Sequence, residues 1–355
     1  MPEVACLKVQ SDLAEKAIVA ARRLGIFNMD LKVQQVREHV LIPLNADPSP
    51  QDLEELKKNV GEFEVSTSNF VSREKCPKTL IDVLEGKLPP HLIASLPKSL
   101  DIVGEVAVVE VPPELEGYKK LLGGAILTVH QNVRGVLAKA SAISGPYRVR
   151  TFEVIAGVGG TETTHHEHGC AYRLDVAKVY FSPRLAYEHG RVSSQVKENE
   201  VVLDMFAGVG PFSILIAKKH RRIKVYSIDI NPVAIQYLKQ NIIINKVQNR
   251  VIPLQGDARK LVEEQLTGVV DRVIMNLPAE ALAYVDVACK ALKPEGGIIH
   301  YYEIAAEPDP LEKAKEKFSE AVSKAGRKIE RFIAERMVKP TAPHEWQVAI
   351  DAIIR

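Results

Sequence analysis

The residues most able to carry chemistry lie in one stretch, Val201 to Asn231, which reads VVLDMFAGVGPFSILIAKKHRRIKVYSIDIN. A β-branched run ends at Asp204, and the chain then turns through Gly208 and Gly210 into a predicted helix. A second predicted strand ends at Asp229, about twenty residues beyond the turn. Glycines let a ligand approach the backbone closely, and an acid at that distance can bind a ribose. The stretch therefore predicts a site for a nucleotide-like cofactor.

What the turn lacks narrows the identity of that cofactor. A dinucleotide-binding turn carries GxGxxG and rests a pyrophosphate on the helix N-terminus, whereas the turn here reads DMFAGVGPF and has no third glycine. An acid beside the first glycine suits a cationic ligand with a free amino group, such as S-adenosylmethionine, better than pyrophosphate. A third acid, Asp257, ends the next strand in PLQGD. Such a turn alone is typical of many α/β proteins, but the turn, Asp229 and Asp257 together predict S-adenosylmethionine.

Length and composition set the general class of the protein. With 355 residues, 46% of them hydrophobic, the chain can bury a large core and is expected to form two or three domains. A net charge of +2 gives no global basic field that demands nucleic acid. The four cysteines are far apart and form no CxxC pair, which favours reduced thiols over a disulfide framework or a zinc site. The start of the chain has no signal-peptide pattern, and no apolar run approaches spanning length. We expect a cytoplasmic protein with no membrane segment.

The first part of the chain predicts a small separate domain over residues 1–66. Strand and helix patterns alternate there as βαββαβ, the order of a ferredoxin-like α+β unit, and Ser11 can cap the first helix. Residues 67–78 are polar and unpatterned, so they are predicted to be a linker. Residues 79–183 mix a strand (DIVGEVAVVEV), a helix from Pro112 and several short strands, which predicts a middle α+β domain.

Residues 184–355 alternate strictly between strands and amphipathic helices, which predicts a parallel sheet. The strands are expected at 200–206, 224–230, 250–256, 271–276 and 298–304. Two final strands, KIERFIAERMVK and EWQVAIDAIIR, follow without a helix between them. Five βα units with a terminal β-hairpin predict a class I methyltransferase fold, a Rossmann-like sheet of seven strands with one strand antiparallel.

The tripeptide Asn276-Leu277-Pro278 follows a strand at the carboxyl edge, where ligands of open α/β sheets bind. Proline holds such a turn rigid, and an asparagine amide offers donors and an acceptor to a planar substrate. Alone, the tripeptide slightly favours an ordinary strand-to-helix turn. In a methyltransferase-like sheet it resembles the (D/N)PP(Y/F)-type element, whose oxygens hold an amino group of a base, although Leu277 replaces the first proline.

Two arginines and one glutamate precede the cofactor strand. Arg148 and Arg150 lie two apart in a segment predicted to be extended, so they share one face that could grip phosphates or an exposed base. For either arginine alone, a solvated strand edge is the favoured interpretation. Glu188, four residues beyond Arg184, could pair with it on a helix.

Two further runs have structural interpretations. The run HHEH, His165 to His168, could suggest a metal cluster, but its spacing suits strand-like alternation in a loop, and no Cys or Asp follows at ligand distance. We therefore predict no metal site. Tyr301 and Tyr302 are expected to be core and rim residues of the fifth strand.

Six stretches extend these patterns: SGPYRVRTFEVIAG, RLDVAKVYFSPRLAYEHGRV, VVLDMFAGVGPFSI, SIDINPVAI, DRVIMNLP and GGIIHYY. Together they closely resemble the archaeal and eukaryotic tRNA guanosine-37 N(1)-methyltransferase family, and the resemblance covers nearly all of the chain. It implies methyl transfer from S-adenosylmethionine to nitrogen 1 of the guanosine just 3′ of the anticodon. It also implies that the N-terminal domain reads the outer corner of the L-shaped tRNA.

The resemblance also implies roles for individual residues. It makes Glu188 the general base, Arg148 the cation at guanine oxygen 6 and Asn276 a base-orienting group. Pro278 shapes the turn, and Tyr180 lies close to the target base. With the loop described above, the expected cofactor contacts are His189, Asp204, Phe206, Gly208, Gly210, Asp229, Ile230, Asp257, Ala258 and Asn276. The sequence GCAYRLD departs from the family pattern and affects local detail of the middle domain only.

The implied reaction makes chemical sense. Nitrogen 1 of guanine carries a proton and a delocalised lone pair, so a base that removes the proton and a cation at oxygen 6 are both needed. Binding of tRNA through phosphates should be sensitive to salt. We therefore expect a tRNA methyltransferase that binds the anticodon loop and outer corner of tRNA, needs no metal and is a monomer. Alternatives are methyl or aminocarboxypropyl transfer to carbon 7 of a tricyclic wyosine-pathway guanosine, alone or as a second activity, and a non-catalytic tRNA-binding protein.

Overall fold

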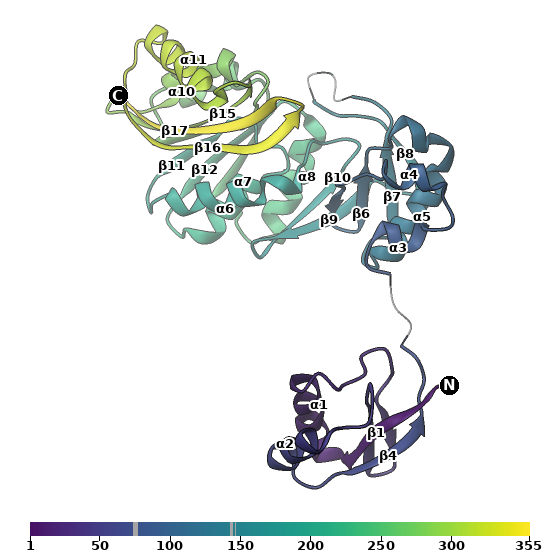
Figure 1. Cartoon of the computed structure of the whole chain (residues 1–355). Coiled ribbons are helices and arrows are strands. Elements are labelled where there is room, and N and C mark those ends of the chain that lie inside the picture. The colour runs from purple at the N-terminus through teal and green to yellow at the C-terminus, as the bar shows by residue number, and fades with distance from the viewer. Residues whose placement is uncertain (74–76, 143–144, 146) are drawn as a thin grey trace. The chain divides into compact units, whose positions relative to one another are not determined.

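The computed structural model describes residues 1–73, 77–142, 145 and 147–355 (Figure 1). The chain divides into two compact units, Met1–Lys78 and Thr79–Arg355. No helix in the described ranges is both long and apolar enough to cross a membrane.

The N-terminal unit is the predicted ferredoxin-like fold. Its elements are β1 (Glu3–Gln10), η1 (Ser11–Leu13), α1 (Ala14–Arg23), β2 (Gln34–Val36), β3 (His39–Pro43), α2 (Pro50–Val60) and β4 (Glu64–Asn69). The strands pair antiparallel in the order β2-β3-β1-β4. Leu7, Ile42 and Leu56 are buried in a core that the two helices close over the sheet.

The predicted cap of the first helix was wrong. The Ser11 hydroxyl donates to the carbonyl of Glu38 at 2.9 Å, so α1 starts through a 3-10 turn without a side-chain cap. In α2, by contrast, Ser49 and Asp52 form a reciprocal capping box. The segment predicted to be a linker begins within ordered structure, because β4 runs to Asn69 and Phe70 is fully buried. Residues 74–76 of that segment lie outside the described residues.

The first part of the second unit holds a four-stranded sheet and a separate hairpin. Its elements are α3 (Leu80–Leu84), α4 (Pro90–Ile93), β5 (Asp101–Val103), β6 (Val106–Val109), η2 (Pro113–Tyr118), α5 (Lys119–Val129), β7 (Gly135–Lys139), β8 (Phe152–Gly157), β9 (Glu162–Glu167) and β10 (Cys170–Asp175). The sheet order is β5-β6-β7-β8, and β9 pairs with β10. The single strand predicted over DIVGEVAVVEV was wrong, because Gly104 turns the chain with a φ of 56° and separates β5 from β6.

The rest of the second unit is the predicted seven-stranded sheet. Its strands are β11 (Val201–Asp204), β12 (Lys224–Asp229), β13 (Val251–Gln255), β14 (Arg272–Met275), β15 (Gly297–Ala306), β16 (Ile329–Ala342) and β17 (Glu345–Ile354). They lie in the order β13-β12-β11-β14-β15-β17-β16, and β17 runs antiparallel to both of its neighbours. This is the arrangement predicted for a class I methyltransferase.

Helices cover both faces of that sheet, because successive strand residues point to opposite sides. The helical elements are η3 (Pro183–Leu185), α6 (Ala186–Gln195), α7 (Pro211–Lys219), α8 (Pro232–Ile244), α9 (Ala258–Leu261), η4 (Val262–Leu266), η5 (Ala281–Tyr284), α10 (Val285–Ala291) and α11 (Pro310–Lys324). In Figure 1, α10 and α11 lie on one face of this sheet, and α6 and α7 lie on the other. Tyr301 belongs to the core cluster that includes residues of α10 and α11, whereas Tyr302 belongs to the cluster that includes residues of α6 and α7. Both tyrosines are fully buried, so neither is a rim residue.

Candidate active site

A cavity of about 470 Å³ lies at the carboxyl ends of β11, β12, β13 and β14. Ligands of open α/β sheets bind at this edge. Segments from the β6–β8 sheet and the terminal hairpin complete its wall, including Arg150, Phe152 and Gln347. Most of the predicted site residues line it: Arg148, Tyr180, Phe206, Gly208, Asp229, Ile230, Asp257, Ala258, Asn276 and Pro278.

The turn after β11 and the end of β12 are joined by hydrogen bonds to Asp229. Gly208 has a φ of 55°, and its N–H donates to Asp229 Oδ2 at 2.7 Å, while the N–H of Asn231 donates to Oδ1 at 2.8 Å. Burial raises the pKa of Asp229, and these two backbone hydrogen bonds oppose that rise. Each carboxylate oxygen keeps a further acceptor direction, so the held carboxylate can still accept from a ribose diol.

The neighbouring wall suits a flat, partly apolar group. Ile230 is 45% exposed although it follows a buried strand, and it lies beside Asp229. Phe206 and Tyr284 meet edge to face with ring centroids 5.2 Å apart. Asp257 caps α9 by accepting from Arg259 N at 2.9 Å and Lys260 N at 3.2 Å. Apolar groups flanked by held carboxylates fit an adenosine with its ribose.

The turn after β14 is held from two sides. Gln347 Nε2 donates to Asn276 Oδ1 at 3.4 Å, and the carbonyl of Pro278 accepts from Ile304 N at 3.2 Å. The second contact comes from β15, which pairs with β14, and the first comes from β17, which lies on the far side of β15. The Asn276 amide therefore reaches the cavity in a fixed position, although Gln347 was not predicted as a site residue.

Arg148 lines the cavity in a conformation that differs from the prediction. The segment was expected to be extended, but Arg148 has a φ of 53° in a turn. The two arginines therefore do not share a strand face, although Arg150 also lines the cavity. Arg148 Nη1 lies 3.9 Å from Glu280 Oε1, a long ion pair that leaves the guanidinium free to meet a substrate oxygen.

Four predicted site residues do not line this cavity: Glu188, His189, Asp204 and Gly210. Glu188 is 1% exposed on α6. Its Oε2 accepts from the Arg191 guanidinium at 2.8 and 3.0 Å and from the Tyr302 hydroxyl at 2.8 Å. Its Oε1 lies 3.2 Å from Arg336 Nε and accepts no hydrogen bond from the described residues. Arg184, the alternative partner considered above, pairs with Asp101 at 2.6 Å.

His189 lies behind the cofactor turn. Its Nδ1 is 2.6 Å from Glu167 Oε1, and its ring meets Phe212 at the start of α7 edge to face. Burial alone would raise the pKa of Glu167, but hydrogen bonds from His165 and His189 lower it to about 2. The first three residues of the HHEH run end β9, which was expected to be a loop with strand-like alternation, and His168 lies in the turn that follows. Glu167, the acid of the run, orients His189.

Asp204 and Gly210 support the turn from below. Asp204 is fully buried, and its Oδ2 accepts from the Ser213 hydroxyl at 2.7 Å. Burial raises the pKa of Asp204 to about 7. Gly210 has a φ of 92°, and a Cβ there would lie 2.4 Å from Leu238 Cδ1. Of the predicted loop residues, Phe206 and Gly208 line the cavity, whereas Asp204 and Gly210 pack beneath it.

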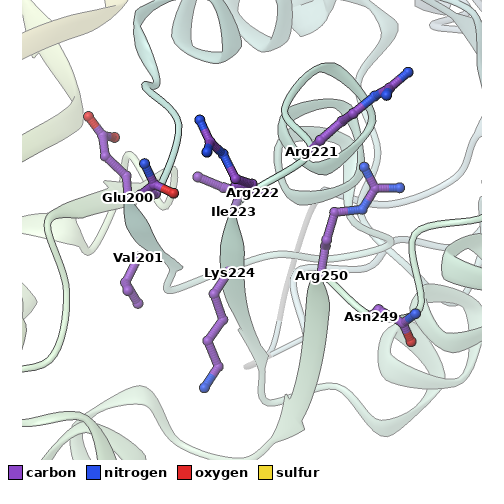
Figure 2. A pocket seen from close by; sticks show the side chains of 9 residues that line it. Glu200, Val201, Arg221, Arg222, Ile223, Lys224, Asn249 and Arg250 are labelled. Carbon is purple, nitrogen blue, oxygen red and sulfur yellow. The ribbon is translucent and has the colours of Figure 1, made fainter.

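A second hollow lies at the opposite, amino-terminal edge of the same sheet (Figure 2). It contains none of the predicted site residues, and four of its nine lining residues are basic. Its residues are Asn199, Glu200, Val201, Arg221, Arg222, Ile223, Lys224, Asn249 and Arg250. Glu200 is the acid in this set, and its carboxylate is already held by Arg272 at 2.7 and 3.1 Å.

Three family models match the chain. The TRM5/TYW2 methyltransferase domain matches residues 163–330, the TYW2 N-terminal domain matches residues 80–161, and the tRNA methyltransferase 5 N-terminal domain matches residues 6–52. These matches together extend along most of the chain.

Relatives match the chain along its length. The tRNA (guanine(37)-N(1))-methyltransferase Trm5b of Pyrococcus abyssi is 42% identical over 97% of this chain and 98% of its own. A solved complex of aTrm5 and tRNALeu is 34% identical, has a TM-score of 0.76 and covers 99% of both chains. The structure of M. jannaschii TYW2 in complex with AdoMet is 32% identical, with a TM-score of 0.57, over 72% of this chain and 99% of that one. The chain therefore belongs to the Trm5 group of the TRM5/TYW2 family of tRNA methyltransferases.

Proposed function

We propose that this chain transfers the methyl group of S-adenosylmethionine to nitrogen 1 of guanosine 37 in tRNA. One observation carries the proposal: the cofactor turn with Asp229 and Asp257, the Asn276–Pro278 turn and Arg148 all line a single cavity. A donor of a methyl group and a planar base can therefore meet in one place. The relatives named for this reaction, and the relative solved with AdoMet, support the assignment.

One group of cavity residues would bind S-adenosylmethionine, and another would bind the guanine. Asp229 would hold the ribose, and Ile230 with Phe206 would pack against the adenine. S-adenosylmethionine supplies the methyl group as a sulfonium, which leaves as a neutral thioether. Asn276 would orient the guanine, and Arg148 would stabilise the negative charge that develops on oxygen 6.

Removal of the proton on nitrogen 1 is assigned to Glu188. Its carboxylate lies outside the cavity lining, with Oε2 occupied by three donors. Oε1 is the oxygen free to accept a proton, and Arg336 at 3.2 Å covers it. The role therefore requires that bound guanine reaches Oε1 and that Arg336 moves aside.

Transfer RNA is the proposed macromolecular partner. A solved relative is a complex with tRNALeu, and the model matched to residues 6–52 describes the N-terminal domain of tRNA methyltransferase 5. We assign the outer corner of tRNA to residues 1–66 and the anticodon loop to residues 79–183 together with the catalytic domain, residues 184–355. We also propose that the protein works in the cytoplasm as a monomer.

The test uses purified protein, labelled S-adenosylmethionine and two tRNA transcripts that differ only in guanosine or adenosine at position 37. We expect label on the guanosine transcript alone, identified as 1-methylguanosine by nucleoside mass spectrometry. Label on both transcripts, or on a different nucleoside, would contradict the assignment.

A second activity on a wyosine-pathway nucleoside has its own support. The segment 80–161 matches the model of the TYW2 N-terminal domain, and a TYW2 structure covers 72% of this chain. The proposed reaction is methyl or aminocarboxypropyl transfer to carbon 7 of a tricyclic guanosine derivative at the same position. Mass spectrometry of tRNA that carries the tricyclic base distinguishes methyl transfer from aminocarboxypropyl transfer, because the two added groups differ in mass.

A further inference from the structure

A continuous row of charged side chains crosses the interior beneath α6. It joins groups from α6 and from the strands β14, β15, β17 and β16, and it begins at the hollow of Figure 2. In order, its members are Glu200, Arg272, His300, Asp351, Arg191, Glu188 and Arg336. We call these seven residues the buried charge row.

The first half of the buried charge row fixes the protonation of a histidine. Arg272 and His300 are fully buried. Arg272 Nη1 lies 2.8 Å from His300 Nε2, and because arginine can only donate, this nitrogen must be the acceptor. His300 therefore carries its proton on Nδ1 and donates to Asp351 Oδ1 at 2.7 Å. Burial also lowers the pKa of His300, which keeps the ring neutral.

The second half connects Asp351 to the proposed base. Asp351 is fully buried and accepts from His300, from Gln195 Nε2 at 3.0 Å and from the Arg191 guanidinium at 3.2 Å and in a second, shorter contact. The same guanidinium donates twice to Glu188 Oε2, through Nε and through Nη2, and Nη2 is shared with Asp351. Burial alone would raise the pKa of Asp351, but its contacts with His300 and Arg191 hold the pKa well below the ordinary value.

The two oxygens of the Glu188 carboxylate therefore differ in their hydrogen bonds. Glu188 Oε2 accepts three hydrogen bonds, two from Arg191 and one from Tyr302, whereas Oε1 accepts none from the described side chains. Arg336, the cation next to Oε1, is 32% exposed and stacks on the Tyr187 ring at 4.2 Å. Arg191 and Tyr302 therefore hold Oε2 in place from the interior. Arg336 is partly exposed, so a movement of its side chain would uncover Oε1.

We propose that Asp351 and Arg191 are positioning residues for the reaction: they clamp Glu188 Oε2 and so make Oε1 the atom that takes the proton from guanine. This inference rests on the proposed function, in which Glu188 is the base. An interior row of paired charges gains little stability over an apolar core of the same shape. The physical argument for its presence is therefore the orientation of Glu188.

The test compares Asp351→Asn with Glu303→Gln. Glu303 is a matched control, because it is 6% exposed on the same sheet and pairs with Tyr301 and Lys317 on the opposite face. The readouts are kcat, KM for tRNA, affinity for S-adenosylhomocysteine, the melting temperature and the dependence of kcat on pH. For Asp351→Asn we expect kcat to fall ~10-fold or more, with ligand affinities within about twofold of the parent. Glu303→Gln should lower the melting temperature and leave kcat unchanged.

The pH profile separates positioning from mere support of the fold. Glu188 faces Arg191 on its own helix, Tyr302 from β15, Arg336 from β16 and, through Arg191, Asp351 from β17. Without the negative charge of Asp351, Arg191 has Glu188 as its one remaining charged partner in the row. The ionised form of the Glu188 carboxylate is then favoured. The acidic limb of the kcat profile should therefore move to lower pH in Asp351→Asn and stay in place in Glu303→Gln.

Two outcomes overturn the inference. One is a kcat for Asp351→Asn within about twofold of the parent; the other is an equal fall in kcat for Glu303→Gln. If Asp351→Asn does not fold, Arg191→Lys decides the question. Lysine keeps the charge but lacks the planar fork with which arginine donates to both carboxylates, and an unchanged kcat there overturns the inference. Glu188→Gln is measured in parallel. An unaffected Glu188→Gln shows that the proposed base is wrong, whereas an impaired Glu188→Gln beside an unaffected Asp351→Asn shows that only the positioning role is wrong.

Discussion

The cavity and the buried charge row use the same three strands for opposite purposes. Each strand contributes two residues that lie four positions apart. They are Arg272, in β14, with Asn276, directly after it; His300 with Ile304, both in β15; and Gln347 with Asp351, both in β17. An even spacing puts each pair on one side of the sheet, about 13 Å apart along the strand. One member of each pair lines the cavity, and the other belongs to the buried charge row.

The cavity and the buried charge row differ in how many hydrogen bonds their polar groups already make within the protein. Asp351 accepts from three side chains and has no exposed surface. In the cavity, Asp229 keeps acceptor directions for a ligand, and the ion pair of Arg148 among the described residues is a long one of 3.9 Å. The comparison teaches that a site needs unsatisfied groups where ligands bind and saturated groups where its parts are held. Glu188 combines both, with one oxygen of each kind.

Substitution of the proposed base should have the largest effect. Glu188→Gln removes proton transfer, so kcat should fall ~10²–10⁴-fold, while affinity for S-adenosylhomocysteine stays within about twofold, because Glu188 lies outside the cavity lining. Steady-state kinetics and calorimetric titration measure the two quantities. An equal loss of cofactor affinity would place Glu188 with the cofactor instead.

The two glycines of the cofactor turn should differ in stability. Gly210→Ala puts a Cβ at a φ of 92° and 2.4 Å from Leu238, so the free energy of unfolding should fall by about 2–4 kcal/mol. Gly208→Ala meets only Tyr180 O, at 3.6 Å, and should cost about 1–2 kcal/mol for its positive φ. Denaturant unfolding of both variants tests the difference, and equal losses would show that Gly210 is not packed as described.

Stability should depend on pH through Asp204. Its pKa is raised to about 7 by burial, so between about pH 4 and pH 7 the folded protein binds more protons than the unfolded chain, and stability falls as pH rises. Asp204→Asn removes this term. Its free energy of unfolding relative to the parent should rise, on the order of 2 kcal/mol, from pH 4 to pH 8. A relative stability that does not change with pH would show that Asp204 is ionised in the fold.

The smallest expected effect is a change in cofactor affinity that distinguishes Asp229 from Asp204, two carboxylates at the ends of neighbouring strands. Asp229→Asn should weaken binding of S-adenosylhomocysteine ~10-fold, because a neutral amide is a poorer acceptor for a ribose diol. Asp204→Asn is the control, and its affinity should match that of the parent, because Asp204 lies beneath the turn. Calorimetric titration measures both, and equal losses would place Asp204 at the cofactor.

The sheet could be predicted because its signals are local. Apolar β-branched runs mark β11 to β15, and two strands without a helix between them mark the terminal hairpin. The residues at the carboxyl ends of those strands, such as Asp229 and Asn276, were predicted because topology alone brings them to one edge.

The interior partners of the site could not be predicted in the same way. Arg184 does not pair with Glu188, because α6 begins at Ala186 and the spacing of four therefore has no helical meaning there. One actual partner, Arg191, lies three residues further along α6, whereas the other two, Arg336 and Tyr302, come from strands far along the chain. A signal for the buried charge row was present in the sequence as ionisable residues within apolar runs: Arg272 in RVIM, His300 in GGIIHYY and Asp351 in VAIDAII.

The division at Lys78 has a consequence for every melting experiment on this protein. Each unit closes its own apolar core, so the chain contains two cooperative blocks, and heat can unfold them at different temperatures. Scanning calorimetry should then give two overlapping peaks, of which the smaller belongs to the first 78 residues, because unfolding enthalpy scales with length. A substitution such as Gly210→Ala should move one peak and leave the other in place, so that the trace itself reports which block was weakened.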